Sequence, residues 1–499
     1  MTLLAIDIGT GGPKASIYAL SGEALCSAER EYSIDQKSPK GELDSADLWE
    51  SLAKVLNQLP SEHRFNVEAV SISSHGESFV TLDASGTPLG PFILNLDPRA
   101  APEAKELAER FGAEELHQLT GLPYHAMYTL PKILWLRRYR PEIFERTARF
   151  LCVEDYLLQR IGVGAFISES LASRTFAFDL KRRAWSDPLL ESVGISREML
   201  AKTVSSGTDL GRASREASAE LGLPAQARWI AGGHDQACCS LGGGGLREAV
   251  AVDGTGTFEC ISISHRERLL SQAGILTNFP KECHVVPGMF LTLAYVPGGL
   301  VPRWLREITG ESDTARRRSY SSLFSKLPRE PTGLLFFPHL VGTGTPWLDA
   351  EARGAIIGLS SETTQRDLYK GALEGITYEM LWNLELLGQA GVRIEHVNAV
   401  GGGARSAAWL QLKADIFGRE IFVIEGEASR MGAAICAGVG IGAFSTWQEG
   451  AGALVHEQRV FHPNVGRQKR YREIFERYKH FAEKVYGYRA AIGQNEVQA

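Results

Sequence analysis

The stretch "LLAIDIGTGGPKASIYALSGE", residues 3–23, decides the fold, because it returns in altered form as "AVAVDGTGTFECISIS" at residues 249–264. Each stretch predicts two apolar strands joined by a turn of small residues. Each also carries an aspartate, Asp7 or Asp253, just before a Gly-Thr-Gly run. We therefore expect two related halves that each begin with a glycine-turn hairpin; chance similarity between two hairpins is the alternative.

Length and composition indicate a globular protein with more than one domain. A single hydrophobic core rarely extends over a chain of 499 residues. The formal net charge of −6 gives no electrostatic reason to expect a nucleic acid or an anionic membrane as partner. No apolar run reaches ~18 residues, the length of a membrane-spanning helix, and the N-terminus lacks the pattern of a signal peptide.

The cysteines argue against a disulfide framework and a zinc ribbon. There are seven of them, an odd number, and they are scattered with no C-x-x-C spacing. Disulfide-poor chains are typical of reducing compartments, so we expect the cytoplasm.

A run of glycines, Gly242–Gly245, predicts a hinge between two domains, one over residues 1–242 and one over 246–499. Helix formers and aromatic residues predict a helical insertion at about 100–205. Further along, a helical pattern fills 365–392 and ends near Gly391. The sequence also predicts a strand at 396–400. It finally predicts a charged helix at 468–488 that docks on the second half.

Three turns of small residues directly follow apolar strands: "DIGTGGPK" (7–14), "DGTGTF" (253–258) and "VGGGARS" (400–406). Small residues let backbone N–H groups approach an anion, and a threonine hydroxyl can add a donor. One such turn alone is most simply an ordinary tight turn, but three at strand ends predict a nucleotide site. No P-loop, HExxH or GxSxG motif is present, and "GVGIGA" at 438–443 follows helical sequence and predicts close packing.

Two side chains of the first turn, Asp7 and Lys14, are candidates for binding a phosphate group or the metal ion that accompanies it. A carboxylate beside a phosphate loop commonly holds Mg²⁺, so Asp7 is a candidate metal ligand, with turn capping as the alternative. Lys14 could reach a phosphate or could be a solvated strand residue.

Taken together, these segments resemble the FGGY carbohydrate kinases, which share the actin-like ATPase fold of hexokinase and actin. "GGHDQACCSLGGG" (232–244) resembles that family's G-x-x-D-x-x-A segment, and "VGGGARSAAWLQLKADIFG" (400–418) its adenosine-binding segment. "MYTLPKILWLRRY" (127–139) fits a family signature with Lys132 and Trp135 in register. "GAIIGLSSETTQRDLYKGALEG" (354–375) fits another, with Gly371 where Ala or Ser is usual. The matches run in order from residue 3 to about 443.

The resemblance implies an α/β fold of two actin-like, ribonuclease H-like domains around a central cleft, with ATP mainly on the second domain and the acceptor mainly on the first. It implies ATP and Mg²⁺, and it suggests a homodimer. The implied nucleotide contacts are Gly9, Thr10, Gly11, Gly254, Thr255, Gly256, Gly299, Gly402, Gly403 and Ala404. The implied metal ligands are Asp7 and Asp235. Ala407 replaces an Asn that some relatives use near adenine.

Under the same resemblance Asp235 is the general base, because an alcohol is a poor nucleophile until a carboxylate orients it and accepts its proton. Turn capping is the alternative for Asp235. His234 has no second ligand at zinc spacing, and the adjacent Cys238 and Cys239 point in different directions, so we expect all three to be packing residues. Gln236 matches a position that contacts the acceptor in glycerol kinases.

The acceptor site is expected around residues 71–99. His75 and Glu77 follow a strand, where polar groups could read several hydroxyls. Asn95, Asp97 and Arg99 are further candidates, with a surface salt bridge as the alternative. Neither the xylulokinase nor the glycerol kinase pattern is complete here, which leaves the acceptor open.

We therefore expect an ATP-dependent kinase of a small sugar, foremost a ketose such as xylulose or ribulose. The alternatives are another acceptor (glycerol, erythritol, gluconate or an autoinducer-like pentanedione) and a non-catalytic actin-like nucleotide-binding protein. The latter would not need Glu77 and Gln236.

Overall fold

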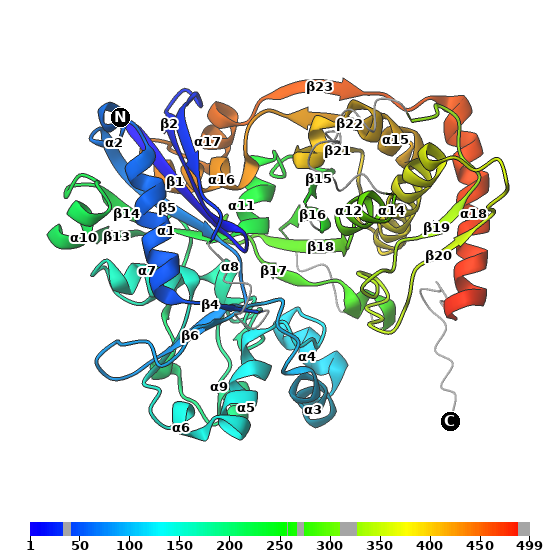
Figure 1. Ribbon diagram of the computed structural model, residues 1–499. Helices are drawn as coiled ribbons and strands as arrows, with labels where there is room; N and C mark the ends of the chain where they lie inside the picture. Colours follow the sequence, from blue (N-terminus) through cyan, green and yellow to red (C-terminus); the bar gives the residue numbers. More distant parts are fainter. Residues whose placement is uncertain (33–40, 257, 267–273, 310–326, 488–499) are drawn as a thin grey trace.

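The computed structural model describes residues 1–32, 41–256, 258–266, 274–309 and 327–487. Thr257 of the second predicted turn and the last residue of the predicted 468–488 helix lie outside these ranges. Two large sheets organise the chain, one in each half (Figure 1). The first consists of β1 (Thr2–Gly9), β2 (Gly12–Ala19), β3 (Ala24–Glu29), β5 (Val67–Ser74), β13 (Asp209–Arg212) and β14 (Arg228–His234). The second consists of β15 (Val250–Thr255), β16 (Glu259–His265), β17 (Lys281–Cys283), β18 (Phe290–Val296), β21 (His396–Gly401), β22 (Glu420–Ile424) and β23 (Glu457–Phe461).

The two sheets share one topology. In the first, β1 pairs antiparallel with β2 and parallel with β5, and β5 continues in parallel to β14. In the second, β15 pairs antiparallel with β16 and parallel with β21, which continues in parallel to β22. The predicted pair of related halves is confirmed. The carboxyl ends of the parallel strands meet at one edge of each sheet, and the predicted turns lie there.

A helix from late in the sequence joins the halves. α16 (Ala428–Gly440) packs on β1, β5, β14 and α11 (Asp235–Gly242), and Figure 1 shows it in orange beside the blue strands. A Cβ added at Gly432 would lie 2.0 Å from the carbonyl oxygen of Cys238, so only glycine allows this crossing. At Gly440 an added Cβ would lie 2.4 Å from Ile230, and the close packing predicted at 438–443 is confirmed.

The predicted hinge at Gly242–Gly245 is a tightly packed turn in this structure. The N–H groups of Gly243, Gly244 and Gly245 all donate to carbonyls of α11, and a Cβ at Gly242 would lie 2.0 Å from the carbonyl oxygen of Ala428. Whether the two halves move about this point stays a prediction.

The stretch at 100–205 is mixed and not purely helical. Its elements are α3 (Ala101–Phe111), α4 (Ala113–Thr120), α5 (Thr129–Tyr139), α6 (Pro141–Phe144), β8 (Arg149–Cys152), α7 (Val153–Arg160), β9 (Phe166–Ser168), α8 (Glu169–Ala172), β10 (Phe178–Asp179), β11 (Ala184–Trp185), α9 (Asp187–Val193) and β12 (Lys202–Val204). β8 joins β6 (Phe79–Leu82), β7 (Phe92–Ile93) and β4 (Glu42–Leu43) in a four-stranded sheet. The apolar part of β8, Phe150–Cys152, is too short to show a period that separates strand from helix, so the sequence alone predicts helix here.

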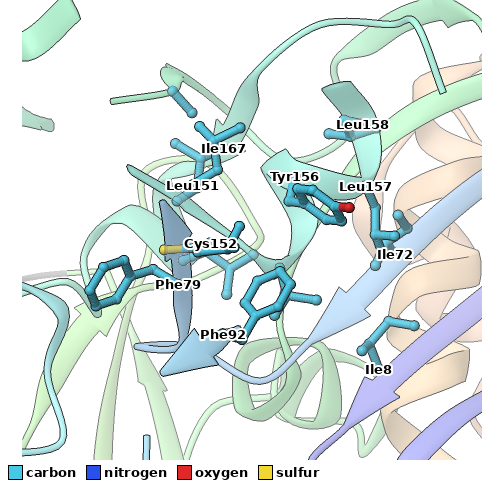
Figure 2. Packing of buried hydrophobic residues seen from close by; sticks show 14 of the residues in the cluster. Ile8, Ile72, Phe79, Phe92, Leu151, Cys152, Tyr156, Leu157, Leu158 and Ile167 are labelled. Carbon is cyan, nitrogen blue, oxygen red and sulfur yellow. The ribbon is translucent and has the colours of Figure 1, made fainter. Parts of the chain in front are cut away.

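The core of the first half lies between these layers. Figure 2 shows Leu151 and Cys152 of β8 among Phe79, Phe92 and Tyr156. Phe92 and Tyr156 meet edge to face with ring centroids 5.3 Å apart, and all five side chains are buried. This packing fixes the sheet edge where β5 ends.

The helices of the second half largely agree with the sequence. α14 (Gln365–Gln389) and α18 (Val465–Tyr486) occupy the two predicted helical stretches, and Gly391 lies just beyond α14 with a φ of 89°. α15 (Ala407–Phe417) follows β21 after a short 3₁₀ turn. α18 docks on α15 through buried aromatic residues. Among the described residues, every helix is too short or too polar to span a bilayer.

Candidate active site

Three parallel strands of the first sheet deliver polar residues to one edge. β1 ends just after Asp7, β5 leads directly into His75, and β14 ends at His234. Ser74 is in register with both Ile8 and His234, so these three chain segments lie side by side. α11 then begins at Asp235, which places that carboxylate at a helix N-terminus above the sheet edge.

Asp7 is a half-buried carboxylate with one close protein donor. The Ser73 hydroxyl donates to Asp7 Oδ1 at 3.0 Å. Burial raises the pKa of Asp7, while that hydrogen bond and the charges of Arg430 and Lys14 oppose the rise. Lys14 is directly opposite Asp7 in the β1–β2 register, which gives it an electrostatic role that the sequence left open.

Asp235 keeps 26% of its side chain exposed, so a substrate can reach it. Burial raises its pKa to about 6; the neighbouring His234 opposes the shift and the charge of Asp7 adds to it. His234 was expected to be a packing residue, and that expectation is wrong. Its Nε2 lies 3.2 Å from Asp235 Oδ1, and its Nδ1 lies 2.7 Å from Glu282 Oε1.

A buried chain of charges continues from His234. Glu282 Oε2 lies 3.3 Å from Arg174 Nη1, and Arg174 Nη2 lies 2.5 Å from Glu77 Oε1. Burial would raise the pKa of Glu77, but the charges of Arg174, His234 and Lys132 and the hydrogen bond from Arg174 together lower it. Glu77 has a φ of 66°, an uncommon conformation for a residue other than glycine, which its buried partners hold in place.

Among the buried polar atoms near this chain that lack a hydrogen-bond partner, one belongs to His75 and one to Asn95. His75 Nδ1 lies 2.9 Å from the carbonyl oxygen of Ile8, while its Nε2 has no partner. Asn95 donates its backbone N–H to Ser78 Oγ at 3.0 Å, while its Oδ1 has none. Buried polar atoms normally find partners, so both are available to a ligand's hydroxyl groups. Gln236 is half-buried on the first turn of α11.

Asp97 and Arg99 contact each other. Arg99 Nε donates to Asp97 Oδ2 at 2.8 Å, its Nη2 lies 2.6 Å from Glu42 Oε1, and its guanidinium lies over the Trp135 ring. This is the salt bridge considered as the alternative, and their role toward a substrate stays a prediction. Lys132 is fully buried and donates to the carbonyls of Leu94 and Met127, both at 2.7 Å.

The second and third turns lie against each other at the edge of the second sheet. Thr255 is in register with Gly401, and a Cβ at Gly403 would lie 2.4 Å from Thr255 Cγ2. Lys413 of α15 lies beneath them, with its ammonium 2.5 Å from Asp253 Oδ2 and 3.0 Å from Thr255 Oγ1.

The tips of the turns are open to solvent. Of the predicted nucleotide contacts, the exposed ones are Thr10, Gly11, Gly256 and Gly402. A Cβ at Gly254 would lie 3.7 Å from Cys239 Sγ, one turn along α11 from Asp235. Ala404 is buried, and Gly299 is the residue before α12 (Leu300–Ile308). Cys238 is buried at the α11–α16 crossing, as expected of a packing residue.

The carboxylates suit a hard divalent cation. Asp235 gains pKa from the charge of Asp7, which means that two partly exposed carboxylates repel each other here. Mg²⁺ typically uses one or two carboxylates together with substrate phosphates and water, and not a cage made only of protein. Within the described ranges there is no cluster of three or more His, Cys, Asp or Glu that could form such a cage.

The model of the FGGY carbohydrate kinase N-terminal domain matches residues 2–242, and that of the C-terminal domain matches residues 249–441. The chain belongs to the FGGY family of carbohydrate kinases. It is therefore a sugar-phosphorylating transferase, and its fold is the two-domain actin-like fold of that family, as the resemblance implied.

Individual relatives agree on the family but differ in acceptor. The xylulose kinase of Bacillus subtilis (strain 168) is 28% identical over 488 residues, which cover 96% of each chain. The gluconate kinase of Lactobacillus acidophilus superposes with a TM-score of 0.88 at 22% identity, covering 97% of this chain and 99% of that one. The ligand-bound xylulose kinase of the same organism gives a TM-score of 0.87 at 21% identity, with the same coverage. A gluconate kinase and a xylulose kinase thus superpose on this chain almost equally well, so the fold does not distinguish between their acceptors.

The residues that the sequence missed are those that pair across long chain separations. Arg174, Glu282 and Lys413 are buried, and each contacts a carboxylate or histidine that is remote in the sequence. A charged residue inside an apolar stretch, such as Lys413 in "WLQLKADIF", was the available signal, because charge is seldom buried without a partner.

Proposed function

We propose that this FGGY family member transfers the γ-phosphoryl group of ATP to a hydroxyl of a small uncharged sugar, a ketose such as xylulose or ribulose. The observation that carries the proposal is Asp235: a carboxylate of raised pKa, partly exposed, at a helix N-terminus beside Asp7 and the glycine turns. Such a group suits a general base for an alcohol.

The proposed step is a direct displacement. The acceptor oxygen forms a bond to the γ-phosphorus, the bond from that phosphorus to the β–γ bridging oxygen breaks, ADP leaves, and the hydroxyl proton passes to a carboxylate oxygen of Asp235. His234 orients that carboxylate. A Mg²⁺ ion held by Asp7 and Asp235 would neutralise phosphate charge.

The backbone N–H groups of the turns would bind the nucleotide. Gly9, Thr10 and Gly11 form the tip of the first turn, and Gly254, Thr255 and Gly256 that of the second. The remaining proposed contacts are Gly299, Gly402, Gly403 and Ala404. Lys413 fixes Thr255 from below, so the second turn needs no rearrangement to meet a phosphate.

The charges around the proposed acceptor site favour a neutral ligand. Arg174 is paired with Glu77 and Glu282, and Arg99 is paired with Asp97. Both arginines are thus already neutralised, and the carboxylates of Asp235 and Glu77 would repel a sugar carboxylate. The ammonium of Lys132 is fully buried and donates to the backbone carbonyls of Leu94 and Met127. Within the alternatives, this favours a ketose or a polyol over gluconate.

The ring nitrogen of His75 and the amide oxygen of Asn95 would accept hydrogen bonds from sugar hydroxyls, with Gln236 beside the reacting hydroxyl. Several convergent acceptors suit a polyhydroxylated ligand better than a pentanedione. The pairing of the arginines does not separate a ketose from glycerol or erythritol.

The test is a coupled ADP-release assay with Mg²⁺ and ATP over xylulose, ribulose, glycerol, erythritol and gluconate. We expect a ketose to have the highest kcat/KM, and gluconate to fall at least about tenfold below it, the effect of ~1.4 kcal/mol. Preference for gluconate would contradict the charge argument. ADP release that no acceptor stimulates would contradict the proposed transfer.

A further inference from the structure

An edge strand of the second sheet is seated on the first half. The N–H of Cys283, in β17, donates to Ser173 Oγ at 3.0 Å, and the N–H of Lys281 donates to the carbonyl of Gly121 at 2.7 Å. A Cβ at Gly121, whose φ is 79°, would lie 2.4 Å from the carbonyl oxygen of Lys281. This close docking places Glu282, between the two anchors, inside the first half.

The Glu282 carboxylate is fully buried and contacts two residues of the first half. Its Oε1 lies 2.7 Å from His234 Nδ1, and its Oε2 lies 3.3 Å from Arg174 Nη1. Arg174 is shared with Glu77, whose carboxylate lies closer to the guanidinium, at 2.5 Å. The contact with His234 adds a hydrogen bond to Glu282. His234 directly precedes Asp235 in the chain, and its Nε2 lies 3.2 Å from the Asp235 carboxylate.

We propose that Glu282 is a positioning residue for phosphoryl transfer: it holds the His234 ring, and His234 holds the carboxylate of Asp235, so the second half's edge strand orients the base on the first half. This inference rests on the proposed role of Asp235 as the base. Among the described residues, His234 is the side chain that contacts the Asp235 carboxylate, so the orientation of Asp235 depends on that ring.

The geometry favours positioning over stability alone. Burying a charged pair and a histidine is weak evidence for stabilisation, because desolvation offsets most of the attraction. Misplacing a reacting group by about 1 Å lowers a rate on the order of 10²-fold. Because β17 belongs to the second sheet, the base is held correctly only when the strand is seated, which links base orientation to the docking of the two halves.

The experiment is a double-mutant cycle of Glu282→Gln and His234→Gln, with the acceptor that gives the highest activity. We expect Glu282→Gln to lower kcat by about 10- to 100-fold while KM for ATP and for the acceptor change less than about threefold. In the His234→Gln background, Glu282→Gln should lower kcat by less than about threefold more, because the two residues act in series.

Glu154→Gln is the matched control. Glu154 is another fully buried glutamate of the first half; it accepts hydrogen bonds from the backbone N–H groups of Ser168 and Gly232 and does not contact His234. Its burial raises its pKa to about 7, so a neutral amide is a mild change. We expect the kcat of Glu154→Gln to stay within about threefold of the wild-type value. That margin is small compared with the loss of ~10² that misplacement of the base would cause.

An unchanged kcat for Glu282→Gln, a loss confined to KM, or an equal loss of kcat in both backgrounds would overturn the positioning role. If Glu282→Gln does not fold, the test is made with His234→Gln, because that substitution leaves the Arg174–Glu282 pair intact. An unchanged kcat in His234→Gln would then overturn the positioning role of Glu282. Asp235→Asn separates the two hypotheses. Full kcat in Asp235→Asn would contradict the proposed function itself. An inactive Asp235→Asn beside a fully active Glu282→Gln would contradict the positioning role alone.

Discussion

Lys413 is buried beneath the second turn, and removing its charge should weaken both the fold and nucleotide binding. Its ammonium bonds to Asp253 Oδ2 and Thr255 Oγ1, and it lies 3.2 Å from Glu259 Oε1. Lys413→Met keeps most of the stem and removes the cation. The variant therefore leaves fully buried acidic groups without their counter-charge.

The loss of folding stability in Lys413→Met depends on which of the two neighbouring acids loses an ion pair. Burial raises the pKa of Glu259 against the opposing charge of Lys413, which favours its neutral form. The main ion pair that the substitution breaks is therefore the one between Lys413 and Asp253. Removing one partner of a buried pair costs about 3–5 kcal/mol, and one charge suggests the lower end, about 3 kcal/mol. For a folding unit of about 150–250 residues this lowers Tm by roughly 6–12 °C.

The assay is scanning calorimetry together with the KM for ATP, and the matched control is Lys370→Met. Lys370 is also buried in the second half, but its partner is Glu374, at 3.5 Å, and not a turn residue. Both variants should lose stability, while only Lys413→Met should raise KM for ATP, by about tenfold, or ~1.4 kcal/mol. A Tm within about 1 °C of wild type, or a KM no higher than that of Lys370→Met, would refute the reasoning.

Two further predictions concern the helix crossing and the base. Gly432→Ala should destabilise the protein by more than about 2 kcal/mol, because its Cβ would lie 2.0 Å from the Cys238 carbonyl oxygen. Gly388→Ala, in α14 with open space around it, should stabilise by roughly 0.5–1 kcal/mol in the same denaturation experiment; equal effects would contradict the packing argument. A base must be deprotonated to act, and burial raises the pKa of Asp235 to about 6. We therefore expect kcat/KM to fall about tenfold per unit as pH drops below about 6 and to level off above it, in a pH–rate profile from 5 to 8; a flat profile would argue against Asp235.

The sequence predicted the repeated hairpin because the signal was local and came twice. Asp7 and Asp253 both precede Gly-Thr-Gly in an apolar strand, and both occupy the same place in sheets of the same topology. Their surroundings differ, however. Asp253 is paired with Lys413, whereas the close partner of Asp7 among the described residues is the Ser73 hydroxyl. A motif alone could not reveal which of the two is free for a ligand.

Partners distant in the sequence set the limits of prediction for the site. His234 was expected to pack, because nothing nearby suggested that Glu282 contacts it. Glu77 and His75 were correctly placed at a strand end, but the pairing of Glu77 with Arg174 depends on a topology that no local pattern contains. The segment at 149–152 failed for a different reason, since a short buried strand and a helical turn share one apolar pattern.

The central claim is that the Asp235 carboxylate is the general base. The most direct test measures both the phosphotransfer rate of Asp235→Asn and the affinity of this variant for ATP. The substitution removes the proton acceptor and keeps the shape, so we expect kcat to fall by about 10²–10⁴-fold. The Kd for ATP, measured by calorimetry without Mg²⁺, should change less than about threefold. Removal of a buried acid with a raised pKa should leave Tm at neutral pH unchanged or slightly higher. An Asp235→Asn protein that binds ATP and still phosphorylates the acceptor at the wild-type rate would contradict the claim that this carboxylate is the base.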